Sequence, residues 1–227
     1  MINNNTCKKL FSCIMFIIPL LYGSNSMAEK QNPSLNSVVG KGDILAVKEL
    51  VEKGTNIETR DIYNRTPLMI ATRMNNVAIA SYLIEKGADV NAKDIIQDTP
   101  YLYAGARGFD KILALTLAHG ADLKSLNRYG GTALIPAAER GSVETVKILI
   151  DAGVNVNHIN KLGWTALMEA IILGDGSRSY QQIISLLIKS GADVNIKDFS
   201  GKSPLILSEN KGFVEISKLL IEAGAQR

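Results

Sequence analysis

The chain has 227 residues, of which 46% are apolar and 21% are charged. This composition is typical of a globular protein and excludes a disordered or collagen-like chain. Lys and Arg outnumber Asp and Glu by 25 to 22, and this excess of +3 is too small to indicate a nucleic acid or an anionic surface as a partner. Two histidines and two cysteines leave little material for metal or nucleophile chemistry, so composition argues against an enzyme.

Residues 1–28 have the pattern of a secretory signal peptide. Two lysines precede the uncharged apolar run Leu10–Tyr22, and small residues then place a cleavage site after Ala28. As a helix this run spans about 20 Å, short of the roughly 30 Å hydrocarbon core, so an uncleaved membrane anchor or a buried helix is the weaker interpretation. Both cysteines lie in the signal, and a cysteine-free mature chain suits an oxidising compartment. We expect an exported protein, in the periplasm of a bacterium.

The rest of the chain repeats itself with a period near 33 residues. Fixed periods of about 20 to 50 residues indicate a solenoid. Six glycines recur at intervals of 33, 33, 33, 38 and 33 residues: Gly54, Gly87, Gly120, Gly153, Gly191 and Gly224. A Thr-Pro-Leu-like motif recurs in the same phase, beginning at Thr66, Thr99, Thr132, Thr165 and Ser203. These five copies resemble the ankyrin repeat, whose 33-residue pattern contains T-P-L-H-x-A.

Each repeat is predicted to contain two helices. The Thr or Ser that opens each of the five motifs is predicted to cap the first helix, because its hydroxyl can accept a hydrogen bond from an amide that has no partner in the helix. A glycine or asparagine is predicted to end this helix in the left-handed conformation. Apolar residues at spacings of three and four then indicate a second helix with one buried face.

The resemblance implies an all-α repeat solenoid of stacked helix-turn-helix ankyrin units with β-hairpin fingers. A domain covering residues 29–227 is expected to hold about six repeats. Their expected ranges are about 33–60, 61–93, 94–126, 127–159, 160–197 and 198–227.

Several residues depart from the family pattern. Pro136 falls inside a first helical turn, where we expect a slight distortion. Gln97 replaces the glycine of a hairpin turn, which argues against a regular tight turn there. Asp110 and Thr116 stand at positions that are otherwise apolar, so the third repeat is predicted to be the least stable. Five extra residues around 174–179 represent either a contact loop at one rim of the groove or neutral variation in loop length.

No residue is predicted to be catalytic, cofactor-binding or metal-binding. His119 and His158 fall in different repeats at different positions, so they share no ligand or triad spacing, and structural roles are the better account. The sequence contains no glycine-rich phosphate loop, CxxC pair or GxSxG element. We therefore expect no cofactor. An enzyme with a site near 174–179 is one alternative.

The resemblance also implies a concave face, formed by the hairpin tips and the first helices, that binds a partner protein. Aromatic and apolar residues fall at the hairpin tips, where their exposure to water is unfavourable unless another surface covers them. Tyr, Trp and Arg are also the residue types enriched in interface hot spots. The residues predicted to bind the partner are Tyr63, Arg65, Ile96, Arg107, Tyr129, Arg140, Trp164 and Phe199. The sole tryptophan, Trp164, is the first choice as an anchor. The alternative is that some tip aromatics pack against adjacent hairpins.

Taken together, these patterns predict an exported, non-catalytic module that binds an unidentified protein, without nucleic acid and without a stable membrane span once the signal is cleaved. A cytosolic or host-directed ankyrin effector with an uncleaved N-terminus is the remaining alternative.

Overall fold

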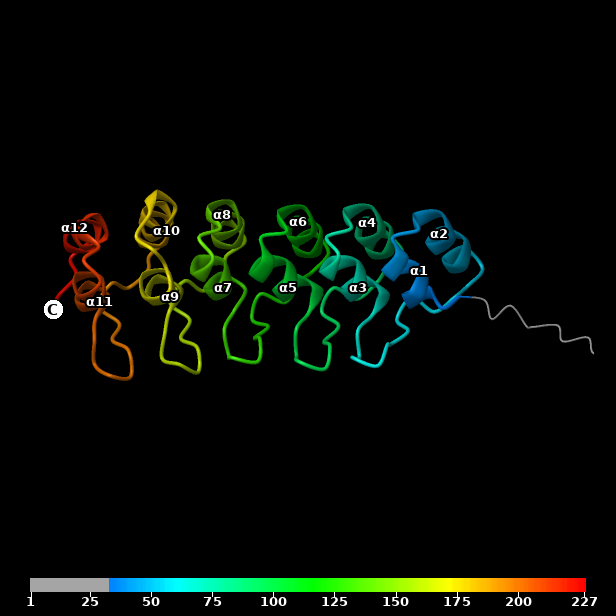
Figure 1. Cartoon of the computed structure of the whole chain (residues 1–227), viewed down its shortest axis with the longest axis horizontal. Coiled ribbons are helices and arrows are strands. Elements are labelled where there is room, and N and C mark those ends of the chain that lie inside the picture. Colours follow the sequence, from blue (N-terminus) through cyan, green and yellow to red (C-terminus); the bar gives the residue numbers. More distant parts are fainter. Residues whose placement is uncertain (1–32) are drawn as a thin grey trace, which may run out of the picture. The chain divides into compact units, whose positions relative to one another are not determined.

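Helices form in pairs along the chain because similar capping and terminating residues recur in most repeats. A computed structural model describes residues 33–227, so the predicted signal peptide, residues 1–28, lies outside the described part. Across that part, twelve helices stack in chain order as a row of pairs (Figure 1). The longest of them has 12 residues, and no helix in this range is long and apolar enough to cross a membrane.

The first helices of the pairs lie side by side, and so do the second helices (Figure 1). The first helices are α1 (Leu35–Lys41), α3 (Pro67–Arg73), α5 (Pro100–Arg107), α7 (Leu134–Glu139), α9 (Ala166–Ile172) and α11 (Pro204–Asn210). The second helices are α2 (Ile44–Glu52), α4 (Val77–Glu85), α6 (Asp110–Ala118), α8 (Val143–Asp151), α10 (Arg178–Lys189) and α12 (Val214–Glu222). The all-helical repeat solenoid expected from the sequence is thus confirmed.

The predicted hydroxyl caps form at four of the five motifs. The side chain of Thr66 accepts a hydrogen bond from the Met69 amide at 3.1 Å, and Thr99 accepts one from the Leu102 amide at 3.1 Å. Equivalent bonds are made by Thr165 and Ser203. Each hydroxyl satisfies an amide that the helix itself leaves without a partner. These caps set where α3, α5, α9 and α11 begin.

The predicted cap at Thr132 is wrong, and Pro136 is the physical reason. Elsewhere the amide four residues after the cap donates to the cap's carbonyl, as Ile70 does to Thr66 at 3.0 Å. Pro136 has no amide, so the Ile135 amide donates instead to the Thr132 carbonyl at 3.3 Å, and the Thr132 hydroxyl is buried without a partner. Helix α7 begins after Ala133 and has only six residues. The distortion expected at Pro136 is therefore confirmed.

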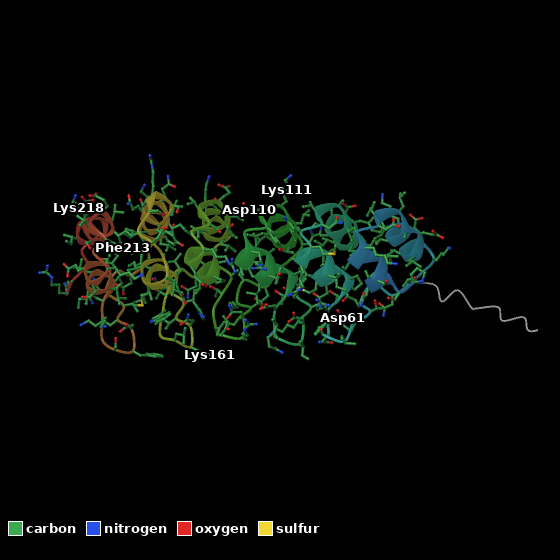
Figure 2. All side chains as sticks on the ribbon, viewed as in Figure 1. Asp61, Asp110, Lys111, Lys161, Phe213 and Lys218 are labelled. Carbon is green, nitrogen blue, oxygen red and sulfur yellow. The ribbon has the colours of Figure 1, made fainter. Side chains whose placement is uncertain are left out.

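In four of the helix pairs, the same position of the second helix holds a fully buried leucine. These residues are Leu83, Leu149, Leu187 and Leu220. In α6 the position holds Thr116, which is also fully buried and donates its hydroxyl to the Leu113 carbonyl at 2.8 Å. Asp110, labelled in Figure 2, lies at the start of the same helix. Its carboxylate accepts from the Thr145 hydroxyl at 2.6 Å. Both polar departures have hydrogen-bond partners, and the lower stability of this repeat stays a prediction.

The loops that lead from one pair to the next are hairpin-shaped, but they contain no regular strand within residues 33–227. Each is organised by an Asp or Asn side chain that accepts from amides two and four residues further on. Asp61 accepts from the amides of Tyr63 and Arg65, both at 2.9 Å. The equivalent residues in the other hairpins are Asp94, Asn127, Asn160 and Asp198. This side-chain acceptor gives all five hairpins the same turn.

The hairpin that holds Gln97 adopts the regular turn, so the expected irregularity is wrong. Gln97 has φ 68°, close to the 72° of Gly130 and the 81° of Gly163 at the corresponding turn positions. Its amide donates to the Asp94 carbonyl at 3.1 Å. The hydrogen bonds of the turn hold a non-glycine residue in the left-handed region, although this conformation costs about 1–2 kcal/mol for a residue with a Cβ.

Asparagine side chains join three of the hairpin segments to the helix ends of the next repeat. Asn91 donates from Nδ2 to the Gly120 carbonyl at 3.0 Å and accepts at Oδ1 from the Asp122 amide at 2.8 Å. Asn157 makes the same two bonds to Gly191 and Asp193. Asn195 makes them to Gly224 and Gln226. We call these paired bonds the asparagine clips.

The extra residues around 174–179 pack against the following pair. The carbonyl of Gly174 accepts from the Lys211 ammonium group at 3.3 Å. Gly176 has φ 75°, and a Cβ there would lie 2.6 Å from the Phe213 ring. The insertion is therefore held by neighbouring side chains at the turn before α10.

Candidate functional site

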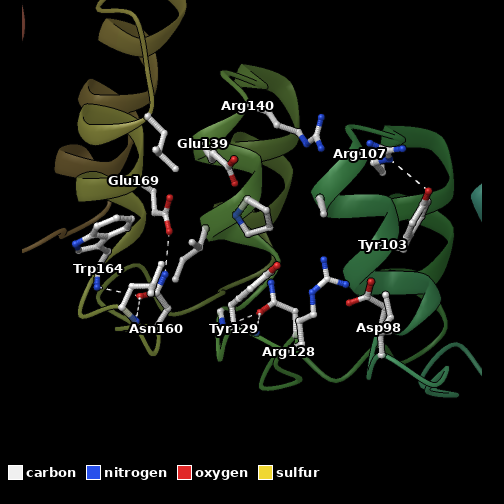
Figure 3. A pocket seen from close by; sticks show the side chains of 18 of the residues that line it. Asp98, Tyr103, Arg107, Arg128, Tyr129, Glu139, Arg140, Asn160, Trp164 and Glu169 are labelled. Carbon is white, nitrogen blue, oxygen red and sulfur yellow. Dashed lines mark hydrogen bonds between the residues drawn. The ribbon is translucent and has the colours of Figure 1, made fainter.

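A groove of about 570 Å³ runs across the first helices α5, α7 and α9 and the hairpins that precede them (Figure 3). We call it the central groove. Five of the predicted binding residues line it: Ile96, Arg107, Tyr129, Arg140 and Trp164. They come from three consecutive repeats, so only stacking of the repeats brings them together.

The other three predicted residues lie outside the groove. Tyr63 is 51% exposed and Phe199 is 80% exposed, and each sits on a hairpin tip beyond one end of the groove. Arg65 forms an ion pair with Asp61 at 2.6 Å. The Phe199 ring also lies against the preceding hairpin, because a Cβ on Gly163 would come within 2.7 Å of it. Packing between adjacent hairpins therefore accounts for part of the Phe199 surface.

Arginines cover the tyrosine rings on this face. Arg73 and Arg107 lie over the Tyr103 ring, at 4.7 and 5.6 Å from its centroid. Arg128 lies over Tyr129 at 4.8 Å. A cation over an aromatic face is attracted by the ring quadrupole. These pairs make one half of the central groove aromatic and predominantly basic, with Asp98 as an acidic residue beside Arg128 (Figure 3).

The other half of the groove contains acidic groups and Trp164. Glu139 at the end of α7 is exposed, whereas Glu169 in α9 is only 4% exposed. One oxygen of Glu169 accepts from Asn160 Nδ2 at 2.9 Å, and the other has no hydrogen-bond partner. Burial, helped by the negative charge of Glu139, raises the pKa of Glu169 to about 7. Figure 3 shows Glu169, Asn160 and Trp164 beside one another.

Asn160 joins two parts of this acidic half. Its Oδ1 accepts from the Trp164 amide at 3.0 Å, so it fixes the backbone that carries the indole. Its Nδ2 donates to Glu169. Of the five hairpin residues at this position, three are aspartates, but an aspartate here would offer Glu169 no donor. The amide therefore serves both the turn and the buried carboxyl group.

Sequence analysis missed Glu169, Asn160 and Tyr103. A signal for Glu169 was available in the repeat register. The corresponding positions of the other first helices hold Ser37, Ile70, Tyr103, Pro136 and Leu207, so Glu169 is the one charged residue in that series. The same comparison between repeats finds an asparagine at position 160 where three of the other hairpins have an aspartate.

The two histidines contact backbone carbonyls. His119 Nδ1 lies 2.8 Å from the Leu115 carbonyl oxygen, and His158 Nε2 lies 2.6 Å from that of Gly130. In the part of the chain that the structure describes, no three His, Cys, Asp or Glu side chains form a group that could hold a metal ion.

Stacked helix pairs with a groove across hairpins and first helices define a helical-repeat protein. A family model described as "Ankyrin repeats (3 copies)" matches residues 3–94 and 102–198. The chain therefore belongs to the ankyrin repeat family, whose members are generally protein–protein interaction modules.

Two solved structures are similar to this chain over most of its length. An ankyrin repeat domain from Acinetobacter baumannii AYE is 60% identical, with a TM-score of 0.83, over 85% of this chain and 98% of that one. The ankyrin repeat protein EF0377 is 43% identical, with a TM-score of 0.81, over the same shares of the two chains. The putative ankyrin repeat protein YahD of Escherichia coli K12 is 49% identical over 57 residues, 25% of this chain and 28% of YahD.

Proposed function

We propose that the chain is an exported, non-catalytic ankyrin repeat protein that binds a partner protein through the central groove. The observation that carries this proposal is the convergence of Tyr129, Trp164 and the arginines of three repeats in one groove. Such aromatic and arginine residues supply most of the binding energy in many protein interfaces. The groove is large enough to receive several side chains of a partner, because ordinary ligand sites have volumes of about 300–1,000 Å³.

The groove is tested by changing Tyr129 and Trp164 together to serine in the tagged full chain. After cross-linking in the source cells, we expect recovery of the partner to fall by at least about tenfold, because a hot-spot side chain contributes roughly 2 kcal/mol or more. The helical circular dichroism should be retained, since Tyr129 is exposed and Trp164 is only half-buried.

A matched control changes the exposed apolar residues Leu45 and Ile221 to serine. Both residues lie on second helices, α2 and α12, outside the groove. Replacing them removes an amount of exposed apolar surface comparable to that lost in the groove variant. Recovery should be unchanged in this control. Equal recovery with the wild type and the groove variant would refute binding through the central groove.

Export is supported by the basic, apolar and small-residue order of residues 1–28. Mass spectrometry of the protein purified from its source cells is expected to find a mature chain that begins at Glu29. An intact chain that begins at Met1 and fractionates with the cytosol would contradict export and favour the cytosolic alternative.

A further inference from the structure

The Trp164 ring lacks the basic neighbour that the tyrosines of this face have. Arginines lie over Tyr63, Tyr103 and Tyr129 at 4.6 to 4.8 Å from the ring centroids. Among residues 33–227, no lysine or arginine is placed over Trp164, although indole is the aromatic group that attracts cations most strongly. The ring that attracts cations most strongly therefore lines the groove without a cation from these residues over it.

The two carboxylates on the same side of the groove also lack a basic partner. Neither Glu139 nor Glu169 forms an ion pair with any residue in the described range. Glu169 is more than nine-tenths buried, and its second oxygen has no hydrogen-bond donor. A buried acceptor without a partner costs about 1–3 kcal/mol, and more when it carries a charge. A donor brought by a ligand would remove this cost.

We propose that Trp164, Glu169 and Glu139 form a seat for a basic side chain of the partner protein. This cation seat rests on the proposed function, because it assigns one subsite within the central groove. A lysine or arginine head placed there would meet the indole face and two negative charges together. The exposed Glu139 makes the first contact, and Glu169 at the floor of the groove supplies the unpaired oxygen.

Apolar side chains next to the seat suit the stem of such a residue. Leu162 and Leu173 both line the groove and are each 50% exposed. Lysine and arginine bury their methylene stems against apolar surface while the charged head reaches polar groups. The leucines are therefore placed to cover the stem.

The surrounding charges divide the groove into two halves. Arg140 lines the groove at the end of α7, while Arg107 and Arg128 are placed over tyrosine rings (Figure 3). Lys211, after α11, donates to the Gly174 carbonyl rather than to Glu169. Asp98 also lines the arginine half, but four lining arginines leave this half with a net positive charge. The partner that fits this pattern carries a basic residue opposite the Trp164 half and acidic or neutral residues opposite the arginine half.

The test uses the nuclear magnetic resonance signal of the Trp164 indole, which is unique because the chain contains one tryptophan. The full chain is titrated with the N-acetyl methylamides of lysine, arginine and norleucine. Norleucine has an uncharged stem like that of lysine. We expect the indole signal to shift at millimolar lysine or arginine but much less with norleucine. The lysine and arginine titrations determine which basic head the seat prefers.

Two variants separate the seat from general electrostatic attraction. Glu169→Gln removes the charge at the floor and should reduce cation affinity at least about fivefold, a coupling of about 1 kcal/mol. Glu144→Gln removes an exposed charge of α8 outside the groove and should leave the titration unchanged. In the wild type, affinity should also weaken from pH 8 to pH 6 as Glu169 takes up a proton, because burial raises its pKa to about 7.

Equal shifts with norleucine and lysine, or no shift with any probe, would overturn the cation seat. An equal loss of affinity in Glu144→Gln would also overturn it. None of these results would alter partner recovery by the Tyr129 and Trp164 variant, so failure of the seat can be distinguished from failure of the proposed function.

Discussion

Changing Leu149 to alanine is expected to lower the free energy of unfolding by about 2–5 kcal/mol, the usual range for a fully buried leucine. Leu149 is completely buried in α8, which packs between α6 and α10. Each repeat contacts only its neighbours, so a cavity in a central pair weakens the link between the two ends of the stack. Urea titrations of the full chain, followed by circular dichroism and by Trp164 fluorescence, would measure both effects.

The matched control is Leu220→Ala. Leu220 occupies the same register position in α12 and is equally buried, but α12 packs on one second helix, α10, instead of two. We expect a smaller loss that is confined to the last pair. In Leu149→Ala the Trp164 transition should move to lower urea, because Trp164 lies beside the weakened link. In Leu220→Ala the loss of the last pair should appear in circular dichroism, while the Trp164 transition stays near that of the wild type. Equal losses and coincident transitions in both variants would contradict a nearest-neighbour stack.

Changing Glu169 to glutamine is expected to stabilise the protein at pH 8 by about 1–3 kcal/mol and to have little effect at pH 4. Burial raises the pKa of Glu169 from 4.5 to about 7. Between these values the folded protein binds the proton more tightly than the unfolded chain, so the free energy of unfolding of the wild type falls as pH rises. Above pH 7 the full cost of the buried charge is present, and glutamine removes it while keeping an acceptor for Asn160.

The measurement is the difference in unfolding free energy between the wild type and Glu169→Gln at several pH values. Taking the difference cancels groups that titrate identically in both proteins. Glu144→Gln, at an exposed position, should show no such pH dependence. A difference that grows towards low pH would mean that Glu169 is stabilised as the carboxylate, contrary to its burial.

Much of the fold follows from local chemistry that can be identified in the sequence. Threonine caps, left-handed glycines and the spacing of apolar residues each involve positions only a few residues apart. A repeat can therefore be identified from its own residues. Thr132 shows the limit of this reasoning. Its hydroxyl matches the other caps, but the hydrogen bonding changes because a residue four positions later lacks an amide. Gln97 shows the converse, since hydrogen bonds of the turn accommodate a residue that has a Cβ.

The site was less accessible from the sequence because it combines three repeats. Trp164, Tyr129 and Arg107 could be predicted as surface residues from their places in the repeat, and the groove brings them together. Glu169 could not be recognised as buried, because its low exposure and its missing partner depend on neighbours from other repeats and from its own hairpin. The burial and hydrogen bonding of the groove side chains depend on residues distant in sequence, whereas the periodic residues determine the backbone conformation of each repeat.

The asparagine clips bear on how the length of this protein can change during evolution. Each clip joins a hairpin to groups about one period further along the chain. Loss or duplication of a whole period therefore keeps the remaining clips in register, whereas loss of a fraction of a period places the asparagines beyond it opposite the wrong residues. A period duplicated before the third repeat or after the fifth would lengthen the surface and leave Tyr129, Glu139 and Trp164 on adjacent repeats. The central groove and the number of repeats can thus evolve independently.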